Sequence, residues 1–422
     1  PGVGQNRSRV ESRGEKHGQP PRQGFPGTPK PVAGCADGRV VSELPPLSLY
    51  VHLPWCVRNC PYCDFNSHSA GNDPPFRRYL DALVRDIGNE SARADNRVVE
   101  SVFLGGGTPS LFEPSAIQRL LDACRASLAL APDCEITMEA NPGTVEHGSL
   151  GSYADAGVTR LSIGAQSFDE RSLKVLGRIH GAADIRTTFR EAEKAGFASV
   201  NLDLMFALPG QSPSEAVADL QSAIDLGPAH ISWYQLTLEP NTVFHRRPPP
   251  GIPGDAEAWD MQVEGQHRLA AAGYEQYEVS AFARAGQCCR HNLNYWTFGD
   301  YLAVGAGAHG KVSRSPGQVI RYRKPANPTT FMEQVEGEAI DAGESLVPPT
   351  DLAFEFMLNA LRLTSGVRHR LLAERTGVDP EAIAEVVEQA VVDGLLSDVD
   401  GEWRPTDNGF RFLNDLQARF LP

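Results

Sequence analysis

The sequence has no apolar run that approaches the roughly 18–20 uncharged residues needed by a membrane-spanning helix. Its first residues also do not follow the order of a secretory signal, in which a charged stretch precedes an apolar core and a small-residue cleavage site. These two absences predict a soluble, cytoplasmic protein.

Positive charge is also scarce, because 39 Lys and Arg face 53 Asp and Glu, for a formal net charge of −14. Residues 1–45 hold seven basic and four acidic residues, a balance of +3, which leaves −17 on the rest. An acidic body repels phosphate backbones, so the composition argues against nucleic acid as a partner. The basic first segment is expected to be a solvated tail rather than a membrane or RNA contact.

The first 46 residues contain eight Pro and eight Gly, with little apolar periodicity, which predicts a disordered N-terminal tail over 1–46. From residue 47, apolar runs rich in β-branched residues alternate with helical patterns. The expected strands are 47–53, 98–104, 134–139, 158–164, 198–206 and 230–238, and the expected helices lie near 75–94, 114–130, 146–156, 182–195, 213–226 and 255–272.

This alternation predicts right-handed βαβ units and a parallel sheet, an α/β fold that closes as a partial (β/α)6 barrel over residues 47–312. Proline and glycine become frequent again near 315–328, so 313–349 is expected to be a linker. Residues 350–422 read as helices followed by a hairpin and a last helix, which predicts a C-terminal domain resembling a winged helix. Because that domain is acidic, a structural or partner-docking role is expected for it.

The eight cysteines do not have the spacing of a disulfide framework, because three of them fall within eight residues. Cys56, Cys60 and Cys63 form a C-x3-C-x2-C pattern directly after the first expected strand. Three thiolates suit an iron–sulfur cluster with one open iron. A structural zinc needs four ligands, and His52 or His68 could complete that alternative site.

Polar residues gather where the expected strands end. Strand 98–104 is followed by three glycines and Thr108. The glycines let the backbone approach a ligand closely. The loop matches neither of the usual phosphate-binding patterns. Glu139, Gln166 and Asp203 each follow an apolar run, and Arg178 adds a cation that could pair with a carboxylate. Each could be a satisfied buried group, but their shared position predicts a binding site at the barrel mouth, beside the cysteines.

The run C-x3-C-x-Y-C after the first strand of a βα barrel resembles the signature of radical S-adenosylmethionine (SAM) proteins. This resemblance implies a 4Fe–4S cluster on the three cysteines and SAM on the open iron. It also implies that Tyr62 packs against the adenine and that the glycine loop binds the amino group of SAM. The residues that match the family's SAM contacts are Tyr50, Gly106, Gly107, Thr108, Glu139, Gln166, Arg178 and Asp203.

Together these segments resemble the oxygen-independent coproporphyrinogen III oxidases and their relatives, the HemW-type heme chaperones. The oxidases carry a further cysteine two residues after the third, where this sequence has Phe65. The segment His291–Trp296 matches the H-N-x-x-Y-W pattern of the HemW branch, in which His291 would be an axial heme ligand beside aromatic surface. The alternatives are a core-packing role for this segment, or ligation by Cys288, Cys289 or His309.

The resemblance therefore implies a heme chaperone that binds heme and transfers it to recipient proteins. It implies heme and heme-receiving proteins as partners, membrane-associated ones among them, and leaves room for a homodimer. The alternative is an oxygen-independent coproporphyrinogen III oxidase, which decarboxylates propionate side chains in heme biosynthesis. A zinc-stapled regulator is a third hypothesis, which the acidic charge disfavours.

Overall fold

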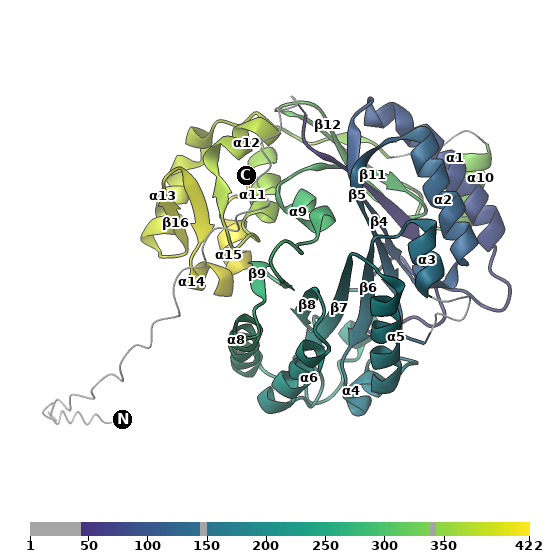
Figure 1. Ribbon diagram of the computed structural model, residues 1–422. Helices are drawn as coiled ribbons and strands as arrows, with labels where there is room; N and C mark the ends of the chain where they lie inside the picture. The colour runs from purple at the N-terminus through teal and green to yellow at the C-terminus, as the bar shows by residue number, and fades with distance from the viewer. Residues whose placement is uncertain (1–43, 144–149, 338–342) are drawn as a thin grey trace, which may run out of the picture.

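The computed structural model describes residues 44–143, 150–337 and 343–422 (Figure 1). The tail expected over 1–46 lies outside the described residues except for 44–46, which lead directly into the first strand. The start of the helix expected near 146–156 also lies outside them.

A 12-stranded sheet forms the centre of the molecule, in the order β14-β13-β12-β11-β1-β4-β5-β6-β7-β8-β10-β9. Six neighbouring strands within it are parallel, which confirms the predicted parallel core. They are β1 (Leu47–Leu53), β4 (Val98–Gly106), β5 (Ala129–Ala140), β6 (Arg160–Gln166), β7 (Ser199–Phe206) and β8 (His230–Gln235).

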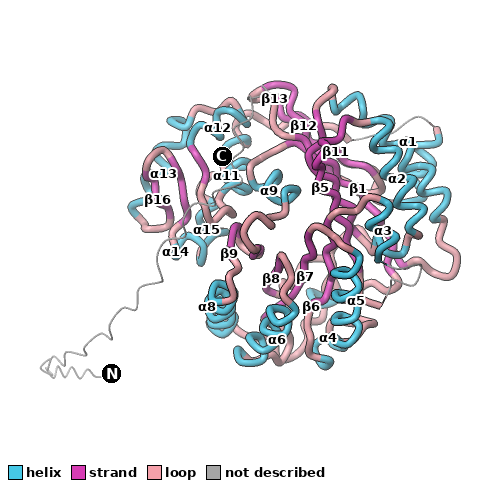
Figure 2. The backbone as a smooth tube through the Cα atoms, in the orientation of Figure 1, coloured by secondary structure: helices cyan, strands magenta, loops and turns pink. Residues whose placement is uncertain are grey.

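Six helices alternate with these strands and cover the outer face of the sheet, as Figure 2 shows for α3, α5 and α6. They are α1 (Phe76–Ala94), α2 (Pro114–Ser127), α3 (Leu150–Ala156), α5 (Ala182–Ala195), α6 (Pro213–Leu226) and α8 (Asp255–Ala271). The start of α6 shows why the chain turns helical there: Ser212 and Glu215 form a capping box, and Pro213 occupies the first turn.

The strands present apolar side chains outward and polar side chains inward. In β1, Leu49 and Val51 are buried in the core shared with the helices. The alternate residue Ser48 lies on the other face, where its hydroxyl is 2.7 Å from that of Ser101 on β4. This period-two alternation places the polar residues of several strands inside the barrel.

The sheet continues well beyond the six parallel strands. On one side β11 (Asp300–Val304) pairs parallel with β1, followed by β12 (His309–Ser315), β13 (Gln318–Arg323) and β14 (Ser345–Leu346). On the other side lie β10 (Ala281–Ala283) and β9 (Glu275–Glu278). Residues 313–349 therefore differ from the expected linker, because they hold part of β12, all of β13 and β14, and α10 (Pro328–Glu336).

A buried ionic group explains why this segment is ordered against the barrel. The Nζ atom of Lys324 lies 2.6 Å from Oδ1 of Asp86 and 2.8 Å from Oε1 of Glu90, both on α1. The Tyr322 hydroxyl also donates to Glu90. All three charged side chains are almost fully buried, where an unpaired charge would cost several kcal/mol. We call Asp86, Glu90, Tyr322 and Lys324 the Lys324 cluster.

The C-terminal region has a separate hydrophobic core around Phe356 and Trp403. Its sheet has the order β15-β17-β16, and the helices and hairpin predicted here are confirmed. The elements are α11 (Leu352–Ala360), β15 (Val367–Arg368), α12 (His369–Thr376), a 3-10 turn (Pro380–Ile383), α13 (Ala384–Val392), β16 (Leu396–Val399), β17 (Glu402–Pro405), α14 (Asp407–Arg411) and α15 (Leu413–Ala418). Across the described residues, none of the helices combines the length and apolarity needed to cross a membrane.

Candidate active site

The cysteine loop begins where β1 ends. Its base is closed by β2 (Trp55–Cys56), which pairs parallel with β3 (His68–Ser69). Trp55 anchors the base on α1, because its ring meets that of Tyr79 edge-on at a centroid distance of 4.6 Å. Cys56, Cys60 and Cys63 are free and half-buried on this loop.

Hydrogen-bond donors point at two of the three sulfur atoms. Thr108 Oγ1 donates to Cys56 Sγ at 3.6 Å, and the Arg178 guanidinium donates to Cys60 Sγ at 3.5 Å. Burial raises the pKa of Cys56, and it raises the pKa of Cys63 to about 11, so without a metal these groups are neutral thiols at pH 7. A bound metal deprotonates a coordinating thiol, and donors to sulfur are what tune an iron–sulfur cluster.

The zinc alternative finds less support near the loop. Both ring nitrogens of His52 are already used, Nδ1 with the Tyr50 hydroxyl at 3.0 Å and Nε2 with the Asn66 carbonyl at 2.8 Å. The Nε2 of His68 lies 3.3 Å from Oδ1 of Asn66. Within the described residues, no three His, Cys, Asp or Glu side chains lie close enough together to hold a single metal ion. A cube-shaped cluster differs, because each thiolate binds a separate iron.

The three glycines let their loop lie directly against the base of the cysteine loop. Gly106 has φ +110°, and a Cβ there would lie 2.3 Å from the His52 ring. A Cβ on Gly107 would lie 2.6 Å from the Trp55 carbonyl oxygen. The backbone N–H of Gly107 donates to the Leu53 carbonyl at 2.8 Å. The Gly106 N–H donates to Oε2 of Glu139 at 3.0 Å, so the glycine loop and Glu139 act as one unit.

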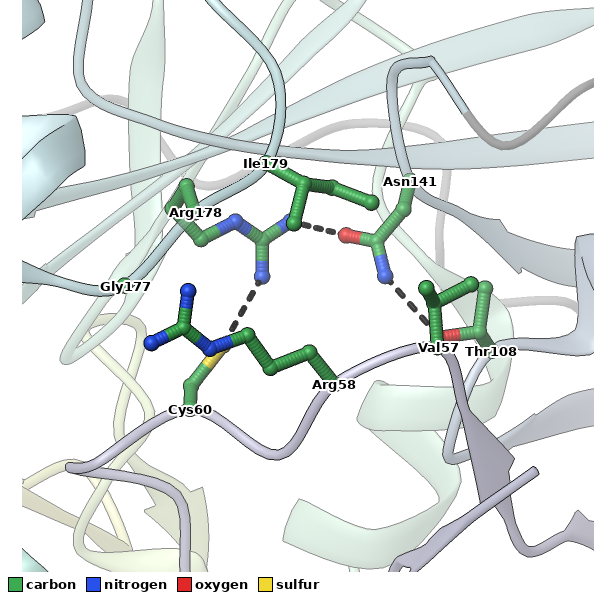
Figure 3. A pocket seen from close by; sticks show the side chains of 8 residues that line it. All are labelled: Val57, Arg58, Cys60, Thr108, Asn141, Gly177, Arg178 and Ile179. Carbon is green, nitrogen blue, oxygen red and sulfur yellow. Dashed lines mark hydrogen bonds between the residues drawn. The ribbon is translucent and has the colours of Figure 1, made fainter. Parts of the chain in front are cut away.

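A pocket opens beside Cys60, and Figure 3 shows the side chains around it. Asn141 joins its two sides, because its Nδ2 donates to Thr108 Oγ1 at 2.9 Å while its Oδ1 accepts from Arg178. Sequence reasoning missed Asn141, although it follows β5 by one residue and carries the same strand-end signal as Glu139. The pocket is lined by Val57, Arg58, Cys60, Thr108, Asn141, Gly177, Arg178 and Ile179.

Glu139 and Asp203 lie deeper in the barrel and are close enough to influence each other. Asp203 accepts from Ser162 Oγ at 2.8 Å and from Asn201 Nδ2 at 2.9 Å. Burial, with the nearby charge of Asp203, raises the pKa of Glu139 to about 7, and burial also raises the pKa of Asp203. Among the described residues neither carboxylate forms an ion pair, so the pair suits a ligand that carries positive charge.

The carboxyl ends of β6 and β7 have unusual backbone. Gln166 has φ +67° and Ala207 has φ +55°, a left-handed conformation that costs about 1–3 kcal/mol for a residue other than glycine. Oε1 of Gln166 accepts a hydrogen bond from Tyr234 at 2.9 Å. Burial, with the nearby charges of Asp203 and Glu139, raises the pKa of Tyr234, and the charge of Arg178 opposes this, so these three side chains lie in the neighbourhood of the Tyr234 hydroxyl.

The two predicted tyrosines lie on opposite sides of this region. Tyr50 stacks on Phe103 at a ring-centroid distance of 6.3 Å, on the inner face of the sheet. Tyr62 lies 6.3 Å from the ring of Phe244 on α7 (Val243–Arg246). Burial raises the pKa of both phenols, so both hydroxyls are neutral.

His291 does not lie where a porphyrin could reach it in this conformation. It belongs to α9 (Arg290–Trp296), which Figure 1 shows on the inner side of the sheet. The His291 side chain is 2% exposed. Its Nδ1 lies 3.0 Å from Ser101 Oγ, and its Nε2 has no partner among the described residues. Burial, helped by Arg160, lowers the pKa of His291 to about 3. Of the alternative ligands, Cys289 is also buried, whereas His309 is exposed.

Comparison with known proteins agrees with this geometry. The model of the radical SAM superfamily matches residues 50–223, and that of the HemN C-terminal domain matches 347–412. The heme chaperone HemW of Escherichia coli (strain K12) is 48% identical over 379 residues, which cover 90% of this chain and 99% of that protein. The heme chaperone HemW of Bacillus subtilis (strain 168) is 31% identical over 393 residues, which cover 89% of this chain and 99% of that protein.

A solved structure also shares the fold. Coproporphyrinogen III oxidase (HemN) from Escherichia coli, a radical SAM enzyme, superposes with a TM-score of 0.76 at 22% identity, covering 90% of this chain and 91% of that one. The predicted α/β barrel and C-terminal unit are therefore confirmed as a known architecture. On the strength of its full-length relatives, the chain belongs to the HemW family of the radical SAM superfamily.

Proposed function

We propose that this protein is a heme chaperone, which binds heme and transfers it to recipient proteins. The observation that carries the proposal is the 48% identity to the heme chaperone HemW of Escherichia coli, over 99% of that protein. Phe65 supports it, because an exposed phenyl ring stands where the oxidases resembled by the sequence carry a further cysteine. The likeness to HemN is at 22% identity and concerns the fold.

We propose that Cys56, Cys60 and Cys63 hold a 4Fe–4S cluster. The three half-buried thiols lie on one loop, and Thr108 and Arg178 point donors at two of them. When bound, the cluster and SAM supply an electron and a reducible sulfonium. Thr108 and Arg178 would orient two thiolates and withdraw charge from their sulfur atoms.

SAM would lie across the mouth of the barrel. Arg178 offers a guanidinium to its carboxylate, and the unit of the glycine loop and Glu139 faces its ammonium group. Asp203 would add negative charge for this cationic ligand, while Gln166, fixed by Tyr234, would offer an amide. Tyr50 and Tyr62 close the sides with flat apolar surface.

The test begins with anaerobic reconstitution of the full chain. We expect 4Fe–4S absorption and electron paramagnetic signals, lost in Cys60→Ala and kept in the control Cys134→Ala, which removes a buried thiol in the first half of β5. On the same sample we expect heme binding and transfer to an apo-acceptor. Decarboxylation of coproporphyrinogen III by the reduced protein with excess SAM would contradict the chaperone function and favour the oxidase.

A further inference from the structure

The barrel exposes large hydrophobic side chains mainly around the cysteine loop. In residues 44–143 and 150–337, six such side chains are exposed, and Val98 is the one remote from the loop. The other five lie on the cysteine loop, on α4 (Glu170–Val175) and the loop that follows it, and on α7. They are Val57, Phe65, Val175, Ile179 and Val243.

These three segments meet at Pro61, between the second and third cysteines. The backbone N–H of Phe244 on α7 donates to the Pro61 carbonyl at 2.9 Å. A Cβ on Gly177 would lie 3.0 Å from Cδ of Pro61. We call Val57, Ile179 and Val243, each at least half exposed, the apolar rim. A concentration of exposed apolar groups at one place marks a binding surface.

A cation accompanies the rim. Arg58 lines the pocket together with Val57 and Ile179 (Figure 3). Its guanidinium forms no ion pair within the part of the chain that the structure describes, whereas Arg178 opposite is held by Asn141 and Gly164. A free arginine beside apolar groups, on a chain of net charge −14, fits a ligand that is apolar with an anionic edge.

We propose that the porphyrin ring of heme docks on the apolar rim, with one face on Val57 and Ile179 and a propionate at Arg58. This inference rests on the proposed function and names the surface that receives the ring. A porphyrin matches the rim because it is a flat apolar plate with carboxylates on one edge. Docking there does not require iron ligation by His291, which is buried.

The first experiment is a heme titration of the reconstituted full chain, followed by absorbance. We expect the double variant Val57→Ser/Ile179→Ser to bind heme about tenfold or more weakly, because two apolar contacts are lost. Val98→Ser and Val392→Ser remove exposed valines elsewhere and serve as matched controls with unchanged affinity. The cluster absorbance of each variant shows that Cys56, the neighbour of Val57, still binds iron.

The second experiment removes first the iron and then the carboxylate charges from the porphyrin ligand. If the ring and its carboxylates carry the binding, metal-free protoporphyrin IX should bind within a few-fold of heme. Arg58→Glu should weaken binding of the free acid by about tenfold and leave binding of the dimethyl ester unchanged, since the ester has no carboxylate that could pair with Arg58.

The outcomes of these experiments distinguish a failure of the docking surface from a failure of the proposed chaperone function. Heme binding by the unaltered protein with unchanged affinity in the rim variants overturns the docking surface and leaves the chaperone function standing. A loss of binding when iron is removed also overturns it, in favour of an axial ligand as the anchor. Failure of the unaltered protein to bind heme overturns both.

Discussion

Two groups of buried charges in this protein are built in opposite ways. In the Lys324 cluster the ammonium group meets two carboxylates at 2.6 and 2.8 Å, and a tyrosine donates to one of them. At the barrel mouth, burial and the charge of Asp203 raise the pKa of Glu139, and neither carboxylate has an ion-pair partner among the described residues. Buried charges that are paired hold segments together, whereas buried charges left uncompensated mark a place for a ligand.

The backbone at the mouth differs in kind from that near the Lys324 cluster. Asp95 and Asn96 have positive φ, but they follow α1, where a left-handed residue is an ordinary helix cap. At the mouth, Gln166 and Ala207 adopt the left-handed conformation at the carboxyl ends of the adjacent strands β6 and β7. Strain of this kind persists where the surrounding structure holds it, and it gathers at binding sites. The strained ends of β6 and β7 therefore fit a site whose geometry is prepared for a ligand.

The largest expected effect comes from breaking the paired group. Lys324→Met should lower the free energy of unfolding by about 3–5 kcal/mol, because two carboxylates of α1 lose their buried cation. The control Arg78→Met, also on α1, breaks the exposed pair with Glu336 of α10 and should change the free energy of unfolding far less, because solvent screens that pair. Chemical denaturation measures both. Equal, small losses would show that the Lys324 cluster does not anchor the extension of the sheet.

The next substitution, Glu139→Gln, should raise the free energy of unfolding, because it removes a buried carboxylate that has no ion-pair partner among the described residues. Glu139 titrates near 7 in the folded state against 4.5 as its ordinary value, so the folded state holds the proton over this range. The cost of the ionised group is absent below about pH 4.5 and complete above about pH 7. Glu139→Gln should therefore stabilise the protein by up to about 3 kcal/mol at pH 8 and hardly at all near pH 4.5.

Thermal unfolding of wild type and Glu139→Gln across this pH range measures that difference. The variant should also bind SAM more weakly, since the charge facing the ammonium group is gone. A stability gain of the same size at pH 4.5 and pH 8 would mean that Glu139 is not an uncompensated charge.

The smallest of the three effects concerns binding alone. Asp203→Asn should weaken SAM binding by about 1–2 kcal/mol, roughly tenfold, while the cluster absorbance stays unchanged. Asp225→Asn on α6 changes an exposed aspartate and should leave the affinity as it is. Isothermal titration of the reconstituted proteins provides the comparison. Unchanged affinity in Asp203→Asn would remove this residue from the mouth site.

The six parallel strands could be predicted because their information is local. Each is a β-branched-rich apolar run, followed at a regular distance by an amphipathic helix. The strands in 313–349 could not, because Lys324 lies in a stretch rich in proline and charge that looks solvated. Its partner Asp86 lies 238 positions earlier, and nothing in the sequence joins the two.

The site shows the same division. Glu139, Gln166 and Asp203 were visible because each ends an apolar run, and the barrel brings strand ends together. Asn141 carried that signal and was overlooked. The burial of His291 could not be predicted from the sequence, because the H-N-x-x-Y-W pattern does not tell which side of a short helix faces the sheet.

The position of β1 has a consequence for how the protein is made. The ribosome delivers β1 and the cysteine loop early, yet β1 pairs on one edge with β11, which begins only at Asp300. Until that strand emerges, one edge of β1 has open backbone groups close to the three cysteines. Iron supplied during translation would thus meet an unfinished barrel until residues 300–304 have been synthesised and β11 can pair with β1.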